Sequence, residues 1–205
     1  KAGIGWIGKN TLILNKDAGS WFFLGEIFTD LPLPTTTADM QNGCGSCKAC
    51  INICPTNAIT GPQKLDARKC ISYLTIENKG SIPEELRPLI GNRIFGCDDC
   101  QLICPWNRFA SYAQVDDFET RHDLDRTDIR SLLAWDEVEF LRKTEGMAIR
   151  RINYSQWVRN VAVAAGNAET TTGIIEALQK RRSERASAKD LLATEHLDWA
   201  LSNHT

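Results

Sequence analysis

Apolar positions at the start of the chain come in short runs. Residues 11–14 and 21–28 are rich in β-forming side chains, and a short turn separates them. Residues 30–34 contain two prolines and interrupt regular structure before a Thr-rich linker over residues 35–42. The pattern predicts that residues 1–38 form the end of an α/β domain.

Two short helices are expected in the middle of the chain. Residues 70–77 and residues 83–90 each have a helical pattern, and Gly91 closes the second one. Both lie within residues 39–112, which we expect to form a separate cysteine-rich module.

The C-terminal part, residues 113–205, is expected to be helical from about Ser131. Helices are predicted over residues 148–152, 157–165, 172–178 and 191–201. Antiparallel helix pairs joined by short turns suggest a small HEAT-like stack. An amphipathic stripe leads into this region, formed by Leu132, Leu133, Trp135, Val138, Phe140 and Leu141.

Composition and charge are those of an ordinary globular protein, with a net charge of −2. Residues 116–139 hold nine acids against three arginines, whereas residues 142–189 hold ten bases against four acids. This asymmetry is either two differently charged solvated surfaces or a basic half that binds a polyanion such as RNA. No apolar run approaches the roughly 20 residues of a membrane span, and no signal peptide is visible, so we expect no membrane association.

The eight cysteines fall within 61 consecutive positions. The first four read Cys44-x2-Cys47-x2-Cys50-x3-Cys54-Pro55, the spacing that bacterial ferredoxins use for [4Fe–4S] clusters. We expect Cys54 to open a helix, with Pro55 at its first position.

The second group lacks the first cysteine of that run and reads Cys97-x2-Cys100-x3-Cys104-Pro105. Cys70 is then needed as the remaining ligand. With the crossed fourth ligands of two-cluster ferredoxins, one cluster takes Cys44, Cys47, Cys50 and Cys104. The other takes Cys54, Cys70, Cys97 and Cys100.

Three other interpretations of the cysteines are less favoured. A disulfide framework requires an oxidising compartment and a wider spread of cysteines. The spacing suits tetrahedral zinc poorly. A single cluster with spare thiols leaves half of the pattern without a role.

The opening residues Gly3-Ile4-Gly5-Trp6-Ile7-Gly8 formally match a dinucleotide fingerprint. The residues after Gly8 have the pattern of a strand instead of a helix, and no acid about 20 residues further on is in a suitable place. The segment is either a tight turn or a backbone that lies close against a large ligand.

Three motifs in this order resemble the epoxyqueuosine reductase family. They are the opening Gly3-x-Gly5-Trp6-Ile7-Gly8-Lys9-Asn10, the eight cysteines with Cys70 between their two groups, and Arg150-Arg151 followed by Arg159-Asn160-x-Ala162-x-Ala164-x-Gly166-Asn167. The resemblance covers essentially the whole chain.

The resemblance implies an α+β fold: the C-terminal part of an α/β cobalamin-binding domain (1–38), a two-[4Fe–4S] ferredoxin-like domain (39–112) and a HEAT-like helical region (113–205). It implies a cytoplasmic, monomeric oxidoreductase that reduces epoxyqueuosine to queuosine at the wobble position of tRNA. Electrons would pass from an external flavodoxin- or ferredoxin-type donor through the two clusters to cobalamin.

Candidate contacts follow from the resemblance and from position in the chain. The expected cobalamin contacts are Lys9, Asn10, Leu14, Gly25, Ser72, Asp98 and Asp99, although the last two could equally be acids at a helix N-terminus. The expected tRNA contacts are Lys79, Arg150, Arg151 and Arg159. No catalytic residue is assigned, because the family's proton-donating aspartate is expected upstream of Lys1, and we expect the sequence to be N-terminally truncated.

Two competing functions remain open. A reductive dehalogenase-like protein shares cobalamin and two clusters, but it would be exported and would not need a basic helical tail. A ferredoxin-type electron carrier would need no helical appendage such as residues 113–205.

Overall fold

The structure is a computed structural model that describes residues 3–34 and 41–205. They fall into two compact units: unit 1 runs to Cys70 and resumes at Asp98–Asp116, and unit 2 comprises Ile71–Cys97 and Asp117–Thr205. The three-domain division expected from the sequence stays a prediction, since its boundary between residues 38 and 39 lies outside the described residues, as does most of the linker.

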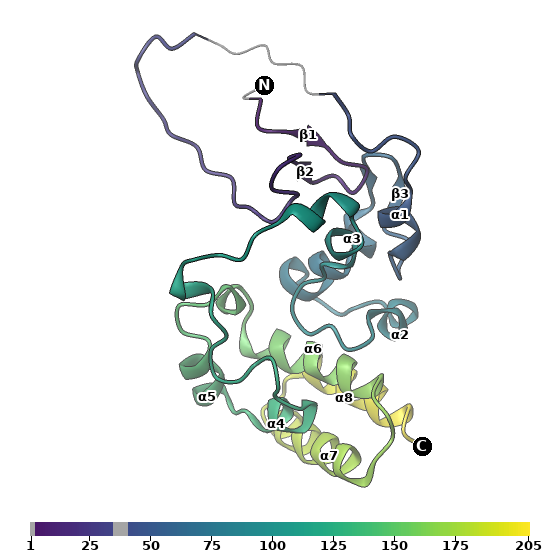
Figure 1. The fold of residues 1–205 in the computed structure, drawn as a ribbon. Coiled ribbons are helices and arrows are strands. Elements are labelled where there is room, and N and C mark those ends of the chain that lie inside the picture. Colours follow the sequence, from purple (N-terminus) through teal and green to yellow (C-terminus); the bar gives the residue numbers. More distant parts are fainter. Residues whose placement is uncertain (1–2, 35–40) are drawn as a thin grey trace. The chain divides into compact units, whose positions relative to one another are not determined.

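Unit 1 contains short elements joined by turns (Figure 1). β1 pairs antiparallel with β2, with Trp6 opposite Leu14, and β3 pairs antiparallel with β4. The elements are β1 (Trp6–Ile7), β2 (Ile13–Leu14), α1 (Ala49–Ile53), β3 (Ile59–Gly61), β4 (Lys64–Leu65), η1 (Ala67–Lys69), α3 (Asp99–Leu102) and η4 (Pro105–Phe109).

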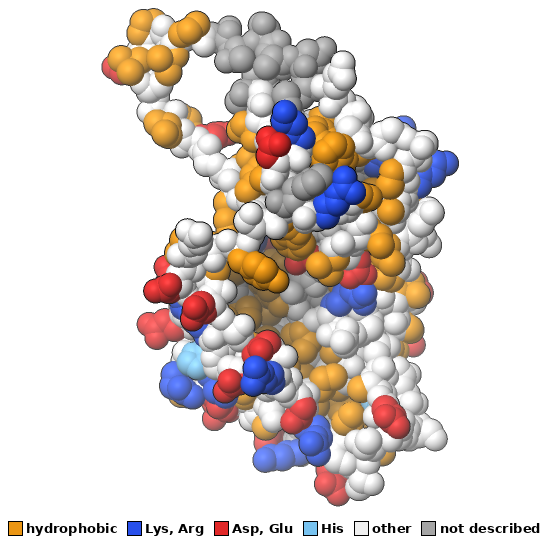
Figure 2. Space-filling model, viewed as in Figure 1, with side chains coloured by type: hydrophobic (Ala, Val, Ile, Leu, Met, Phe, Trp, Pro, Cys, Tyr) orange, Lys and Arg blue, Asp and Glu red, His pale blue; other side chains and the backbone are white. Residues whose placement is uncertain are grey.

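The strand expected over residues 21–28 is wrong. Residues 21–34 have no helix or strand, and Phe23, Ile27 and Phe28 are 86%, 93% and 93% exposed. Figure 2 shows hydrophobic side chains along this loop. A strand must pair its backbone groups with a neighbour, and no strand in the described part of the chain pairs with this one.

The helix expected to begin at Cys54 is also wrong. Cys54 is the C-cap of α1, with an extended backbone (ψ 111°), so the helix precedes this cysteine. Cys104, by contrast, is the N-cap of η4, with Pro105 at the first position.

Unit 2 is helical, as the apolar pattern predicts. Its helices match the expected ones closely, except that α7 extends well past residue 178 and residues 73–77 form a π-helix. The elements are η2 (Tyr73–Glu77), η3 (Glu84–Leu86), α2 (Arg87–Ile90), α4 (Ile129–Ala134), α5 (Glu137–Lys143), η6 (Ala148–Arg151), α6 (Tyr154–Gly166), α7 (Thr172–Ser187) and α8 (Leu191–Ser202), and a 3₁₀ turn η5 (Asp116–Phe118) crosses the boundary between the units.

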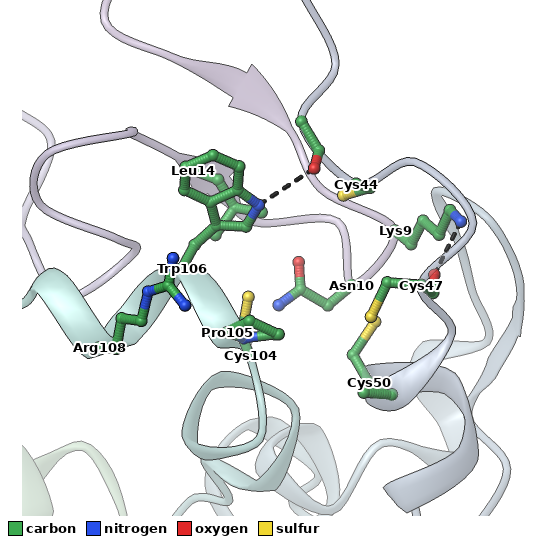
Figure 3. A pocket seen from close by; sticks show the side chains of 12 residues that line it. Lys9, Asn10, Leu14, Cys44, Cys47, Cys50, Cys104, Pro105, Trp106 and Arg108 are labelled. Carbon is green, nitrogen blue, oxygen red and sulfur yellow. Dashed lines mark hydrogen bonds between the residues drawn. The ribbon is translucent and has the colours of Figure 1, made fainter.

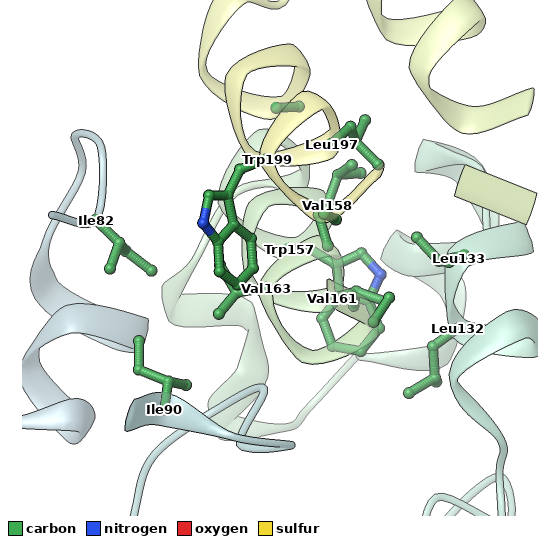
Figure 4. Packing of buried hydrophobic residues seen from close by; sticks show 14 of the residues in the cluster. Ile82, Ile90, Leu132, Leu133, Trp157, Val158, Val161, Val163, Leu197 and Trp199 are labelled. Carbon is green, nitrogen blue, oxygen red and sulfur yellow. The ribbon is translucent and has the colours of Figure 1, made fainter. Parts of the chain in front are cut away.

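Helix α6 is the centre of unit 2. Almost every residue from Tyr154 to Gly166 is buried, and a capping box between Asn153 and Gln156 starts the helix. Figure 4 shows α6 side chains packed against α8, α4 and the segment with Ile82 and Ile90.

The predicted amphipathic stripe is right for four of its six members. Leu132, Leu133, Trp135 and Phe140 are buried, and Trp135 stacks on Trp157 with ring centroids 5.2 Å apart. Val138 and Leu141 are exposed, because they lie on the outer face of α5.

None of the helices in residues 3–34 and 41–205 is long and apolar enough to cross a bilayer.

Candidate metal centre

Four cysteines line one cavity of about 260 Å³ in unit 1 (Figure 3). Cys44 and Cys47 lie on the loop before α1, Cys50 is inside α1, and Cys104 comes from the distant start of η4. The fold therefore brings together the four residues that the sequence assigns to one cluster.

The thiols of this cavity influence one another. Burial raises the pKa of Cys50, and negative charge on Cys44, Cys104 and Cys47 raises it further. Burial likewise raises the pKa of Cys104, with Cys44 and Cys47 acting in the same direction. Thiolates crowded in this way need a positive partner, which iron supplies.

Four thiols that line one cavity match the ligand number of an iron–sulfur cubane, for which thiolate is the usual ligand. Among the described residues, no three His, Cys, Asp or Glu side chains are placed to bind one metal ion. All eight cysteines are free of disulfide bonds.

Side chains of the opening glycine-rich motif bind the cluster loop, the segment before α1 that carries Cys44 and Cys47. Lys9 donates hydrogen bonds to the carbonyl oxygens of Gly45 and Cys47, both at 2.7 Å. The Asn10 amide donates to the carbonyl of Cys100 at 3.3 Å. The glycine-rich start therefore contacts both cysteine groups.

Two indoles enclose the start of the cluster loop. Trp6 and Trp106 meet edge to face with centroids 4.9 Å apart, and Trp106 donates a hydrogen bond to the Gly43 carbonyl at 3.1 Å. A Cβ on Gly43 would lie 2.7 Å from Trp6 and 2.8 Å from Trp106. Neither Trp106 nor Gly43 is among the residues expected from the sequence, although each lies close to a ligand position along the chain.

The second predicted ligand set stays a prediction. Cys54, Cys70 and Cys100 belong to unit 1, and Cys97 is the last residue of the first segment of unit 2. The Cys54 sulfur accepts a hydrogen bond from the Ala58 amide at 3.3 Å. Such N–H···S bonds stabilise a ligating thiolate.

The candidate cobalamin contacts separate into two groups. Lys9, Asn10 and Leu14 line the cysteine cavity, whereas the other four do not. Gly25 lies in the exposed irregular loop, and Ser72 belongs to unit 2. Asp98 and Asp99 form the N-terminus of α3, which is the position of the alternative interpretation.

The candidate tRNA contacts require one correction. Lys79, Arg150 and Arg151 are exposed, and Arg151 forms an ion pair with Glu77. Arg159 is completely buried, so it is not available to an external ligand. Arg181, also in the basic half of the sequence, is buried and donates to the carbonyl of Leu133.

Comparison with known proteins agrees with this geometry. The family described as 4Fe-4S double cluster binding domain matches residues 43–107. The epoxyqueuosine reductase of Pseudomonas aeruginosa is 57% identical over 204 residues, which cover 100% of this chain and 55% of that protein. The chain spans about half the length of the curated relatives it matches.

Solved structures of epoxyqueuosine reductases also resemble this chain along almost its whole length. The epoxyqueuosine reductase of Streptococcus thermophilus superimposes with a TM-score of 0.85 at 30% identity, over 98% of this chain and 52% of that one. An epoxyqueuosine reductase crystallised with an epoxyqueuosine-modified tRNA stem loop superimposes with a TM-score of 0.77 at 27% identity, over 98% of this chain and 61% of that one.

The cavity and the matched domain define an iron–sulfur protein of the double-cluster class. Similarity along the whole chain then makes the assignment specific. Along its whole length the chain is homologous to epoxyqueuosine reductases, and the resemblance seen in its motifs is confirmed.

Proposed function

We propose that this chain is the electron-delivering and tRNA-holding part of an epoxyqueuosine reductase. The observation that carries the proposal is the cavity lined by Cys44, Cys47, Cys50 and Cys104, in a chain homologous to these enzymes throughout. The reaction removes the epoxide oxygen of epoxyqueuosine at the tRNA wobble position, consuming two electrons and two protons and releasing water.

The proposed cofactors are two [4Fe–4S] clusters and cobalamin. When bound, the clusters supply electrons one at a time, and cobalamin supplies the strong reductant that the epoxide requires. Cobalamin is proposed on the family resemblance and on the position of Lys9, Asn10 and Leu14 beside the cluster cavity. A corrin ring is much larger than this cavity, so most of its contacts would come from elsewhere.

The residues of unit 1 would hold and orient the first cluster. Four thiolates would ligate its irons, and Lys9 would fix the loop that carries Cys44 and Cys47. The two indoles would shield this loop from water. Because Asn10 bonds to the Cys100 carbonyl, the opening motif would also fix one ligand of the second cluster.

The residues of unit 2 would hold the tRNA. Arg151 pairs with Glu77, two residues before Lys79, so these basic side chains occupy one region of unit 2 with Arg150 beside them. Arginine and lysine bind phosphate by charge, and such binding weakens steeply with salt. The protein would be a cytoplasmic monomer that receives electrons from a flavodoxin- or ferredoxin-type donor. The proposal also includes a cobalamin-binding domain and a HEAT-like domain.

Iron analysis tests the cluster proposal. Anaerobically reconstituted chain should hold about eight irons. Cys104→Ala and Cys70→Ala should each lose about half, and their reduced forms should each keep a different electron paramagnetic resonance signal. A single zinc per chain would contradict the proposal.

Titration with an anticodon stem-loop tests the tRNA proposal. Arg150→Glu and Arg151→Glu should weaken binding and flatten its salt dependence, by about one unit of slope for each phosphate that is no longer bound. Arg182→Glu is the matched control, because Arg182 is an exposed arginine of α7 that pairs with Asp198. Equal effects of all three variants would favour non-specific attraction and a simple electron carrier.

A further inference from the structure

One face of α6 and its C-cap carries a row of hydrogen-bond donors that turn away from water. The row consists of Gln156, Arg159, Asn160 and Asn167, and the first three are buried to within 3% exposure. Spacings near three, four and seven place such residues on one side of a helix. We call this set the α6 donor row.

The donor row binds backbone carbonyls of the segment between the two cysteine groups. Arg159 donates to Leu74 at 2.9 Å, to Asn78 at 2.7 Å and to Gly80 at 2.6 Å. Asn160 donates to Thr75 and to Ile94, both at 2.8 Å. The two ends of the row act in the same way: Gln156 donates to Asn78, and Asn167 donates to Arg87 and Gly91.

These carbonyl groups require hydrogen-bond donors from outside their own segment. Leu74 and Thr75 lie in the short π-helix η2, near whose end helical carbonyls lose their partners within the helix. Both residues are buried, so water does not replace those partners. The guanidinium of Arg159 is buried among carbonyl oxygens, and burial lowers its pKa to about 10, which leaves it charged at neutral pH.

The bound segment connects directly to two predicted cluster ligands. It begins at Ile71, immediately after Cys70, and ends at Cys97. The Gly96 amide donates to Thr75 Oγ1 at 2.9 Å, and Cys97 packs against the hydrophobic core of unit 2. Asn160 therefore fixes both Thr75 and Ile94, one near each ligand in the chain.

We propose that the α6 donor row positions the ligands Cys70 and Cys97 of the second cluster, with Asn160 as its central positioning residue. The inference rests on the ligand set of the proposed function. It gives the Arg159-Asn160 motif a role in cluster retention in place of the tRNA contact expected from the sequence.

Asn160→Asp tests the inference, since it keeps the side-chain shape but replaces the N–H donors with an acceptor facing two carbonyls. Reconstituted variant should hold about four irons in place of about eight, and one of the two reduced-state resonance signals should disappear. Far-UV circular dichroism should stay unchanged. Asn203→Asp is the control, because the Asn203 amide makes one long bond, 3.3 Å, to the Gly166 carbonyl.

Double variants identify which cluster is lost. Asn160→Asp combined with Cys104→Ala should hold almost no iron, whereas Asn160→Asp combined with Cys70→Ala should match Cys70→Ala alone. If the parent chain holds about eight irons and Asn160→Asp holds as many, the proposed role of the donor row is wrong but the cluster assignment still stands. Loss of both clusters together with helical signal would also overturn it, as a general folding effect. A parent chain with a single cluster would overturn the ligand set and the inference together.

Discussion

Lys9 Nζ lies 2.7 Å from the carbonyl oxygen of Cys47, across 38 residues of chain. The same ammonium group bonds equally closely to Gly45. The loop that carries Cys44 and Cys47 is therefore held by a cation from the opening glycine motif. Its charge also opposes the negative charge that four thiolates bring to the cavity.

Replacing Lys9 by Met should weaken the first cluster without unfolding the protein. Both hydrogen bonds of Lys9 are exposed, so together they contribute about 1.5 kcal/mol, which corresponds to roughly a tenfold change in an equilibrium or rate constant. We expect iron release to a chelator to become about tenfold faster for the cluster that Cys104→Ala removes. Lys48→Met, at an exposed lysine of the same loop, is the control and should release iron at the parent rate.

Replacing Gly43 by Ala should prevent the first cluster from assembling normally. The added Cβ would approach both indoles, of Trp6 and Trp106, to within 3 Å, and neither ring has a flexible end that can move aside. We expect iron content after reconstitution to fall by about half, from about eight to about four. Gly25→Ala is the matched control, since nothing lies within 4 Å of its added Cβ. Equal iron in the two variants would contradict this packing.

The stability of unit 2 should depend on pH through His196. This side chain is fully buried, with Nε2 accepting from the Ile82 amide at 3.1 Å and Nδ1 placed 2.8 Å from the Leu192 carbonyl. Burial lowers its pKa from 6.5 to about 4. Between these values the unfolded chain binds a proton that the folded chain does not, so folding is favoured less as the pH falls.

Urea unfolding of the metal-free chain measures this dependence. The free energy of unfolding should be independent of this group above pH 6.5 and should fall by roughly 1 kcal/mol per pH unit between about pH 6.5 and 4. The His196→Gln variant should have a lower free energy of unfolding at neutral pH, but that free energy should change less steeply with pH. Arg87, Glu195 and Arg159 act on the imidazole and remain in both proteins, so the comparison isolates His196 together with its effect on the pKa of Glu195.

Replacing Gly166 by Ala should destabilise the contact between α6 and α8. The added Cβ would lie 2.6 Å from the Trp199 ring and 2.9 Å from Ala200 Cα. Overpacking of this kind costs about 1–3 kcal/mol, which exceeds the helix propensity that alanine gains. Chemical denaturation should report the loss, while Gly80→Ala, whose nearest atom is 3.7 Å away, should change stability little.

Spacing along the chain was sufficient to predict three cysteines of the cavity and most helices of unit 2. Three thiols within seven residues lie close together in almost any loop conformation, so the sequence predicts Cys44, Cys47 and Cys50 on one cavity. The helices of unit 2 follow the apolar period, because burial of one face decides them locally. These features depend on residues that are close together in the sequence, so the sequence pattern is enough to predict them.

Features that depend on a distant partner were predicted poorly. Residues 21–28 have the composition of a strand, yet strand formation requires a second strand that composition does not reveal. Cys54 and Cys104 both precede proline, but only Cys104 starts a helical turn.

Arg159 separates what the sequence determined from what the tertiary structure decided. The sequence alone established the double-cluster cysteine pattern, the helical C-terminal region and its excess of positive charge. It could not distinguish Arg151, which is exposed, from Arg159, which is buried against the carbonyls of Leu74, Asn78 and Gly80. The direction of a side chain depends on which helix face the core covers, and only the packed structure of unit 2 settles that.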